Sequence, residues 1–400
     1  MMRMAMVAEF VESESRFAAF SRRVWAIVGY MRSRGWQVQV LSPRIGKNSS
    51  EAKARGDVRR LVQGYSAWRS ILGSPIASIL APVSVIGYLH SLRKFRPDVV
   101  IIAASNAVLL LETTVAARLL GIAIVFDVHD SWLVADAVYP GRVRNWLRRK
   151  LEGFALRGGE VVVGVTSRQA HTMRRGYQLN ARKVMTIYSG ATPSVRTQGQ
   201  CTPRYDFVHA GPPRSNYNTQ ALLDALAILI QKGRCFRTAF LGTLPGGDTK
   251  HWTAEAARRG LLRWVDFLPP VPPARITETL SDARVGLVTL GNESVFKAAI
   301  STKSFDYLSA GLPILYLGPK DSEQAELIER FGVGLVVDSP SAFADAAERI
   351  LLDDRVYADL QTNAEAAALD LAWNVLLEPL HRRLVQFVDS RPQRGPMPVS

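Results

Sequence analysis

A histidine at the end of an apolar run is the first residue whose type and position indicate chemistry. The run Gly121–Phe126 predicts a buried strand, and His129 follows it between two acids. Ligand sites in parallel sheets form at the carboxyl ends of strands. A histidine there can donate to a sugar hydroxyl or a phosphate, while Asp127 and Asp130 hold its tautomer. The alternative is a helix N-cap at Asp130 or Ser131, with His129 filling space. The strand-end position favours the functional interpretation.

A second candidate is a group of small hydroxyl residues and a lysine at the start of a predicted helix. The group consists of Ser301, Thr302, Lys303 and Ser304. Backbone N–H groups and the helix dipole favour an anion at such a terminus, and Lys303 adds a positive charge, so the group suits a diphosphate. Asp306, one turn later, can reach a pair of ribose hydroxyls. A capped surface helix with a solvated lysine explains these residues equally well.

A third candidate follows the predicted strand Tyr205–Ala210. Gly211 permits close approach of the backbone to a ligand there, and Arg214 can chelate phosphate oxygens. The alternative, slightly better supported for each residue alone, is an ordinary loop between a strand and a helix. No GxGxxG pattern is present, so a dinucleotide cofactor is not indicated.

Several other catalytic patterns are absent from the sequence. It contains no Walker A loop, no HExxH, no GxSxG elbow and no DxD pattern. We therefore expect no resident cofactor and no dedicated site for a divalent metal. The two cysteines, Cys201 and Cys235, form no CxxC and no Cys/His cluster, so a zinc site is not expected and a reducing compartment is the default.

Two successive series of alternating apolar strands and helices must position these candidates. A Ser-, Thr-, Gly- and Pro-rich segment from Ser189 to Pro203 separates them and indicates a linker. We place a first domain at residues 1–195 and a second at residues 196–372. The sequence therefore predicts the α/β class, with two Rossmann-like doubly wound domains facing each other across a cleft, which is the expected ligand site.

The excess of positive charge lies in the first half of the chain. The formal net charge is +15, and residues 1–195 hold 28 basic and 12 acidic side chains. Such asymmetry indicates an anionic partner: a nucleic acid, an anionic membrane or a phosphorylated substrate. Nucleic acid is the weakest of these because no motif of interleaved aromatic and basic residues is present.

The uncharged stretch Ile71–Leu89 requires a membrane check. Its length of 19 residues approaches that of a spanning helix, but Pro75 and Pro82 interrupt it. We expect a loop and a helix that either dip into a membrane interface or pack inside the first domain. The start of the chain has too short an apolar run for a signal peptide. These features predict a cytoplasmic protein, peripheral on the inner face of a membrane.

Three segments resemble the retaining GT-B glycosyltransferases of family 4, the group 1 type. Glu12–Arg16 is similar to their opening loop and helix, and Phe126–Asp130 to their strand-end histidine motif. Thr302–Pro313, the most specific match, is similar to their lysine and acidic-helix signature for the sugar-nucleotide. The resemblance covers most of the chain in order. It implies that the closing helix from Trp373, within residues 373–400, crosses back to complete the first, acceptor-side domain.

The chain also departs from the family pattern. Many members carry two glutamates separated by seven residues; here Asp306 stands at the second position and Ala298 eight residues before it. The acid that faces the donor sugar is thus missing or supplied elsewhere, with Glu293 as the candidate. The basic pair common after the first strand of the second domain is reduced to Arg214.

The resemblance implies a metal-independent, hexosyltransferase-type enzyme. It would move a sugar with retention from a nucleotide-sugar to a lipid-linked or saccharide acceptor, in bacterial-type polysaccharide or glycolipid assembly. Lys303, Arg214 and the helix start at Ser301 would stabilise the departing diphosphate, and His129 would orient the transferred sugar or the acceptor. Two alternatives remain open: a catalytically silent GT-B scaffold, motivated by Ala298, and a GT-B-fold sugar-nucleotide epimerase.

Overall fold

The computed structural model describes residues 1–9, 18–42, 58–60, 82–105, 107–133, 142–194, 203–243 and 247–390. The chain divides into two compact units. The first, unit 1, comprises Met1–Tyr188 and Leu376–Ser400, and the second, unit 2, comprises Ser189–Val375. Each unit is described by itself below. The Glu12–Arg16 segment and residues 71–81 of the uncharged stretch lie outside the described residues.

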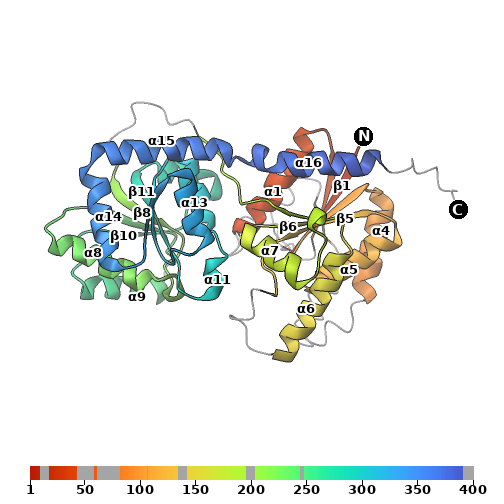
Figure 1. The fold of residues 1–400 in the computed structure, drawn as a ribbon, viewed down its shortest axis with the longest axis horizontal. Coiled ribbons are helices and arrows are strands. Elements are labelled where there is room, and N and C mark those ends of the chain that lie inside the picture. Colours follow the sequence, from red (N-terminus) through yellow and green to blue (C-terminus); the bar gives the residue numbers. More distant parts are fainter. Residues whose placement is uncertain are drawn as a thin grey trace. The chain divides into compact units, whose positions relative to one another are not determined.

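Unit 1 is built on a seven-stranded parallel sheet with the order β3-β2-β1-β4-β5-β6-β7 (Figure 1). Its strands are β1 (Arg3–Ala8), β2 (Gln37–Ser42), β3 (Val58–Arg60), β4 (Val99–Ala103), β5 (Ala123–Val128), β6 (Val161–Gly164) and β7 (Val184–Thr186). Its helices are α1 (Ala18–Ser33), α4 (Pro82–Phe95), α5 (Ala107–Leu119), α6 (Arg142–Arg157), α7 (Ser167–Gly176) and most of α16 (Trp373–Asp389).

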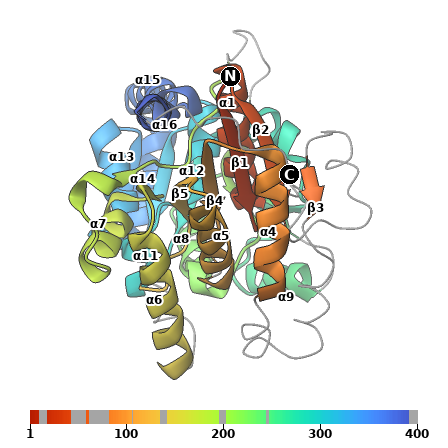
Figure 2. The same cartoon turned by 90° about the vertical axis from the view of Figure 1, so that its right-hand side faces the viewer.

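The apolar strands explain why this sheet is covered on both faces. Successive side chains of β1 point to opposite faces, and both Ala5 and Met6 are fully buried. Helices α4, α5 and α6 cover the face of the sheet that carries Ala5, and their apolar residues form one core with it (Figure 2). On α4, Tyr88 and Leu92 are buried in that core, so the described end of the uncharged stretch packs inside unit 1.

Unit 2 repeats the doubly wound plan with six parallel strands in the order β10-β9-β8-β11-β12-β13. Its strands are β8 (Tyr205–Ala210), β9 (Thr238–Leu241), β10 (Val265–Leu268), β11 (Ala283–Thr289), β12 (Ile314–Leu317) and β13 (Gly334–Val337). Its helices are α8 (Thr219–Gln231), α9 (Gly247–Arg258), α10 (Ile276–Leu280), α11 (Ser294–Lys297), α12 (Thr302–Ser309), α13 (Glu323–Phe331), α14 (Pro340–Leu352) and α15 (Asp354–Asp370).

The fold class expected from the sequence is confirmed: both units are α/β and doubly wound. In both sheets the strand order reverses beside the first strand, so β1 and β4 flank one switch point and β8 and β11 the other. The boundaries shift slightly. The strand predicted at Gly121–Phe126 lies at Ala123–Val128, because Gly121 forms a turn after α5 with a φ of +61°. Asp127 therefore belongs to the strand itself.

Part of α16 packs on α1 within unit 1. The Tyr30 hydroxyl donates to Glu378 at 2.5 Å, and the Arg34 guanidinium donates to the same carboxylate at 2.6 Å. His381 meets the rings of Tyr30 and Trp36 edge-on. These contacts attach α16 to the carboxyl-terminal end of α1 and to Trp36, just before β2. No helix in the described ranges is long and apolar enough to cross a membrane.

A tyrosine in unit 2 requires a glycine beneath it. The Tyr307 ring of α12 lies so close to Gly286 of β11 that an added Cβ would stand 2.3 Å from the ring. Gly286→Ala should therefore destabilise the protein by about 1–3 kcal/mol, the usual cost of overpacking. Gly29→Ala, at an exposed position of α1 with no atom within 4 Å of the added Cβ, should instead stabilise it by about 0.5–1 kcal/mol. Thermal melting of both variants distinguishes this account from one in which Gly286 is replaceable.

Candidate functional site

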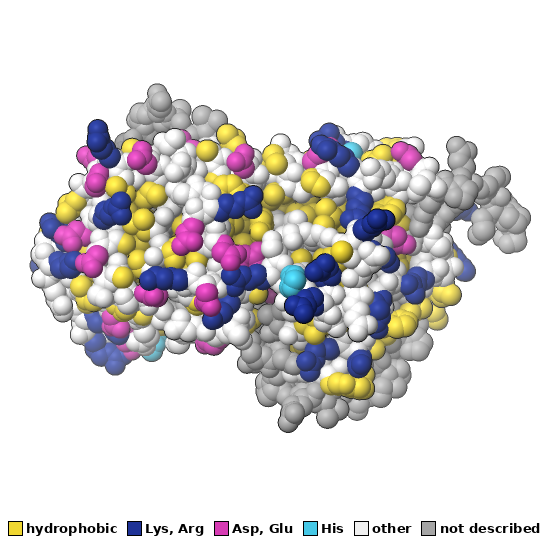
Figure 3. Space-filling view, in the orientation of Figure 1, with side chains coloured by type: hydrophobic (Ala, Val, Ile, Leu, Met, Phe, Trp, Pro, Cys, Tyr) yellow, Lys and Arg dark blue, Asp and Glu magenta, His cyan; other side chains and the backbone are white. Residues whose placement is uncertain are grey.

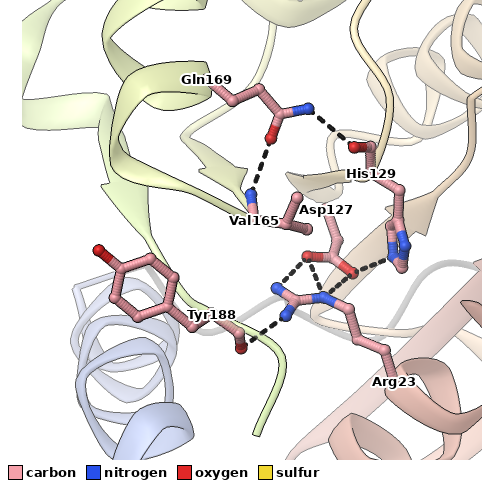
Figure 4. A network of polar contacts seen from close by, with 6 residues as sticks. All are labelled: Arg23, Asp127, His129, Val165, Gln169 and Tyr188. Carbon is pink, nitrogen blue, oxygen red and sulfur yellow. Dashed lines mark hydrogen bonds and ion pairs between the residues drawn. The ribbon is translucent and has the colours of Figure 1, made fainter. Parts of the chain in front are cut away.

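A buried ion pair holds the histidine region of unit 1. The Arg23 guanidinium of α1 donates to both carboxylate oxygens of Asp127, with a shortest distance of 2.7 Å, and to the carbonyl of Tyr188 at 2.9 Å (Figure 4). Both side chains are buried, at 1% and 2% exposure. His129, two residues after Asp127, places Nε2 at 3.0 Å from Asp127 Oδ2 and its ring against Phe20.

The charge of Asp127 determines the tautomer of His129. Burial alone would raise the pKa of the Asp127 carboxyl, but Arg23 and His129 hold that pKa well below its usual range. An ionised carboxylate accepts hydrogen bonds only, so His129 Nε2 donates to it. Nδ1 of the neutral ring is then an acceptor. Asp130, the other acid considered from the sequence, is exposed.

One further side chain, Gln169, holds the backbone around His129. Gln169 of α7 donates from Nε2 to the His129 carbonyl at 2.8 Å and accepts from the Val165 N–H at 2.9 Å. Residues 129–133 form a bend and a turn, and no described helix begins there. The Ser131 hydroxyl accepts from the Leu133 N–H at 3.3 Å. Residues 134–141, where a helix capped by Asp130 or Ser131 would continue, lie outside the described residues.

Glu152 of α6 anchors the segment after His129. Its Oε2 accepts from the Ser131 hydroxyl at 3.2 Å, from the Trp132 N–H at 3.0 Å and from the Tyr177 hydroxyl. Burial raises the pKa of Glu152 to about 7, although these three donors oppose the shift. Glu152 thus connects the position of the His129 segment to the packing of α6 and α7.

In unit 2, Tyr307 positions the helix that carries Lys303. Its hydroxyl accepts from the Ala210 N–H at 2.8 Å and lies 3.1 Å and 2.9 Å from the carbonyls of Val208 and Leu287. These bonds fasten α12 to the carboxyl-terminal parts of β8 and β11. Lys303 lies one turn earlier on the same helix, and its Nζ is 3.0 Å from Nε2 of His209.

The lysine and the histidine form a partly buried pair with a low proton affinity. Burial and the neighbouring Arg214 charge lower the pKa of Lys303 to about 7, and Asp306 opposes them. Burial, with the Lys303 charge, places the pKa of His209 well below its usual range. His209 is therefore neutral, and its Nε2 accepts from the lysine. The electrostatic coupling shows that Lys303, Arg214 and Asp306 lie in one neighbourhood.

Two glycines allow the turns beside this pair to approach each other. Gly211 and Gly242 have φ angles of +89° and +106°, and a Cβ on Gly242 would lie 3.2 Å from the Gly211 Cα. Arg214 follows in the same loop, exposed, with its guanidinium 5.8 Å from the centre of the Tyr217 ring. Its backbone N–H and carbonyl both bond the Thr219 hydroxyl, which fixes the loop against the start of α8.

The start of α12 is held by a glutamine. Gln324 Oε1 accepts from the Ser301 N–H at 2.9 Å and from the Ser304 hydroxyl at 3.0 Å. Ser304 is fully buried, so its hydroxyl serves this contact. Ser301 occupies the N-cap position without a side-chain cap bond, and Thr302 is partly buried. Gln324 is also fully buried, and its Nε2 makes no hydrogen bond.

Glu293 and Ala298 flank the short helix α11. Glu293 is exposed at its N-cap, and its carboxylate lies over Gly291, where an added Cβ would stand 2.1 Å from Oε2. Ala298 is the C-cap. Among the residues that the structure describes, no group of three or more His, Cys, Asp or Glu side chains is arranged to hold a metal ion.

The structure adds three residues that sequence patterns missed. His209 and Gln324 lie inside stretches that resemble an ordinary apolar strand and an ordinary helix start. Arg23 lies among the apolar positions of α1. A polar residue within an apolar run was the available signal for His209 and Arg23.

One protein family matches the part of the chain that contains the Arg23–Asp127 ion pair. Residues 20–190 match the model of the family described as "Glycosyl transferase 4-like domain". These 171 residues, less than half of the chain, are similar to that family. The match contains Arg23, Asp127 and His129, and it confirms the family 4-like resemblance seen in the sequence.

Individual glycosyltransferases agree with this assignment. D-inositol 3-phosphate glycosyltransferase of Corynebacterium jeikeium is 28% identical over 144 residues, which span 34% of this chain and 32% of that protein. A glycosyltransferase of Rickettsia africae has the same fold, with a TM-score of 0.72, 13% identity and coverage of 98% and 99% of the two chains. Anabaena HepE in complex with UDP and glucose also has this fold, with a TM-score of 0.69, 15% identity and coverage of 96% of this chain and 100% of that chain. The fold of the whole chain is therefore that of GT-B glycosyltransferases.

The Glu152 anchor makes a prediction about stability. Glu152→Ala leaves the Trp132 N–H and the Tyr177 hydroxyl without their buried acceptor and should cost about 1–3 kcal/mol for each. Glu152→Gln keeps an acceptor oxygen and should cost less.

The same anchor predicts a pH dependence. The pKa of Glu152 is raised in the folded protein, so its contribution to stability is full below about pH 4.5 and is lost as pH rises towards 7. Glu152→Gln should remove that loss. The free energy of unfolding of the variant, relative to that of the unmodified protein, should therefore be higher at pH 8 than at pH 5. Denaturant unfolding at both pH values measures this, and an identical difference at the two would contradict it.

Proposed function

We propose that the protein is a glycosyltransferase that uses a nucleotide-sugar donor. The observation that carries the proposal is the Lys303–His209 pair beside Arg214, at the carboxyl-terminal end of β8 in a GT-B fold. Two cations and the N-terminus of α12 meet there, which suits a diphosphate. The glycosyl transferase 4-like domain in residues 20–190 supports the same class of reaction.

In the proposed complex, unit 2 binds the donor. Lys303 and Arg214 hold the diphosphate, with Gly211 allowing its close approach and the backbone at Ser301 and Thr302 adding N–H donors. Asp306 reaches the ribose hydroxyls. Glu293 supplies the acid that many family members carry at the position of Ala298. Uridine nucleotides are the first donors to try, because HepE was crystallised with UDP-glucose.

Transfer then exchanges one bond at the anomeric carbon for another. The bond to the diphosphate oxygen breaks, the acceptor oxygen bonds to the same face of the sugar, and the acceptor proton leaves with the diphosphate. Lys303 and Arg214 stabilise the negative charge that develops on the departing group, without a metal ion. Asp127 is held by Arg23 and is unsuited to be a nucleophile. His129 orients the transferred hexose or the acceptor hydroxyl.

The acceptor belongs to the proposal as well. We assign the acceptor to unit 1 and favour a lipid-linked or saccharide acceptor in polysaccharide or glycolipid assembly, in the cytoplasm. The basic excess of residues 1–195 supports an anionic acceptor or surface. The name of the Corynebacterium relative, a D-inositol 3-phosphate glycosyltransferase, supports a phosphorylated acceptor equally.

The role of Lys303 predicts that donor binding takes up a proton. With its pKa lowered to about 7, Lys303 is mostly neutral at pH 8, and a bound diphosphate restores its charge. Affinity for a nucleotide-sugar, whose diphosphate does not titrate here, should fall up to about tenfold per pH unit above pH 7. Calorimetry in two buffers of different ionisation enthalpy should show proton uptake near pH 8 and almost none at pH 6.

Two variants make this measurement specific. Lys303→Ala should weaken binding by about 1.5–3 kcal/mol and abolish the proton uptake. Lys297→Ala removes an exposed lysine of the same unit, paired with Asp321, and should leave both unchanged. Unchanged affinity in Lys303→Ala would remove that lysine from the donor site.

The role of His129 separates transfer from binding. His129→Ala should abolish transfer while nucleotide affinity stays within about twofold, because the proposed donor contacts lie in unit 2. His171→Ala, at an exposed histidine of α7, serves as the control. Full turnover by the His129 variant would show that the residue only fills space.

A further inference from the structure

Helix α6 concentrates positive charge on unit 1. Its sixteen residues hold six basic side chains and one acid. The acid is Glu152, which is buried and bonded to Tyr177, Trp132 and Ser131. The solvent side of the helix therefore carries no negative charge to offset the basic residues. In Figures 1 and 2, α6 extends beyond the ends of α4 and α5.

The same helix exposes large apolar side chains on the side away from its core. Asn145, Glu152 and Leu156 face inward and are at most 3% exposed. Trp146, Leu147 and Phe154 are 56%, 49% and 52% exposed.

Helical spacing places these apolar residues in one strip with two cations. Leu147 and Phe154 are two turns apart and share one side of the helix. Lys150, between them in sequence, and Arg157, about one turn after Phe154, are both exposed. Lys150 lies 5.8 Å from the centre of the Trp146 ring. Figure 3 shows basic and hydrophobic side chains together over the region where α6 lies in Figure 1. We call Trp146, Leu147, Lys150, Phe154 and Arg157 the outer strip.

We propose that the outer strip of α6 docks unit 1 on an anionic lipid bilayer. A helix that lies in a membrane interface carries Trp, Phe and Leu on one side with Lys and Arg around them. The apolar side chains enter the boundary between headgroups and acyl chains, and the cations meet the lipid phosphates. The outer strip has both components and no acid.

An anionic bilayer fits this surface better than the alternatives. RNA would engage the cations and stack on Trp146 and Phe154, but it would leave Leu147 in water. A second copy of the chain would bring two basic helices together and cost repulsion. The inference does not depend on the proposed transfer reaction, although a docked enzyme would meet a lipid-linked acceptor where it is displayed.

Co-sedimentation of the full chain with vesicles tests the proposal. The protein should pellet with phosphatidylglycerol–phosphatidylcholine vesicles at low salt, stay in the supernatant with pure phosphatidylcholine, and be released at 1 M salt, where screening acts within about 3 Å. Lys150→Glu combined with Arg157→Glu should weaken binding more than tenfold, since each charge near the surface contributes about fivefold.

An apolar variant and a matched control complete the test. Leu147→Ser with Phe154→Ser should weaken vesicle binding at least tenfold and keep the melting temperature. Leu352→Ser with Leu369→Ser, at exposed leucines of unit 2, should bind like the unmodified protein.

The proposal is overturned if the unmodified protein does not bind anionic vesicles, or if both outer-strip variants bind them as well as the unmodified protein does. It is also overturned if the protein binds single-stranded RNA or itself instead of vesicles, and the outer-strip variants lose that binding. Nucleotide-sugar affinity, measured on the same samples, should not change. A loss of vesicle binding alone therefore bears on docking and leaves the transfer proposal intact.

Discussion

The contact on which the candidate site of unit 1 depends is the ion pair between Arg23 and Asp127. A carboxylate buried at the end of β5 is unstable without a partner, and Arg23 supplies two donors to it from α1. Once Asp127 is ionised it can only accept, so it orients His129 and leaves Nδ1 as an acceptor. The third guanidinium nitrogen, Nη1, donates to the carbonyl of Tyr188, so one side chain connects α1, β5 and the segment after β7.

In unit 2, uncharged contacts of Tyr307 position the helix that carries Lys303. The Tyr307 hydroxyl binds the backbone at Ala210, and Gly286 leaves room for its ring. These contacts hold α12 where Lys303 contacts His209 and where the positive charge of Arg214 lowers the pKa of Lys303. Two cations and a buried histidine in one place cost free energy in the empty protein. The diphosphate proposed above would relieve that cost.

The fold and the positions of the site residues could be predicted from the sequence to different extents. Apolar strands alternating with helices predict two doubly wound sheets, because only a parallel sheet covered on both faces needs such strands. Lys303 could be found because it lies at the start of a recognisable helix, and Arg214 because it follows a recognisable strand. His209 could not, because one polar residue in the strand Tyr205–Ala210 does not disturb its apolar pattern. The partner of Asp127 depends on tertiary packing of α1, which no local spacing records.

Consumption of a nucleotide-sugar is the central step proposed for this protein, and one time course measures it directly. The full chain is incubated with UDP-glucose and other nucleotide-sugars, with and without phosphorylated and lipid-linked acceptors, and proton NMR follows both the free nucleoside diphosphate and the sugar. The account predicts release of the nucleoside diphosphate, faster with an acceptor, and an unchanged anomeric configuration in the product. Intact donors throughout would contradict transfer and favour a silent scaffold. A changed sugar still attached to its nucleotide would show an epimerase instead.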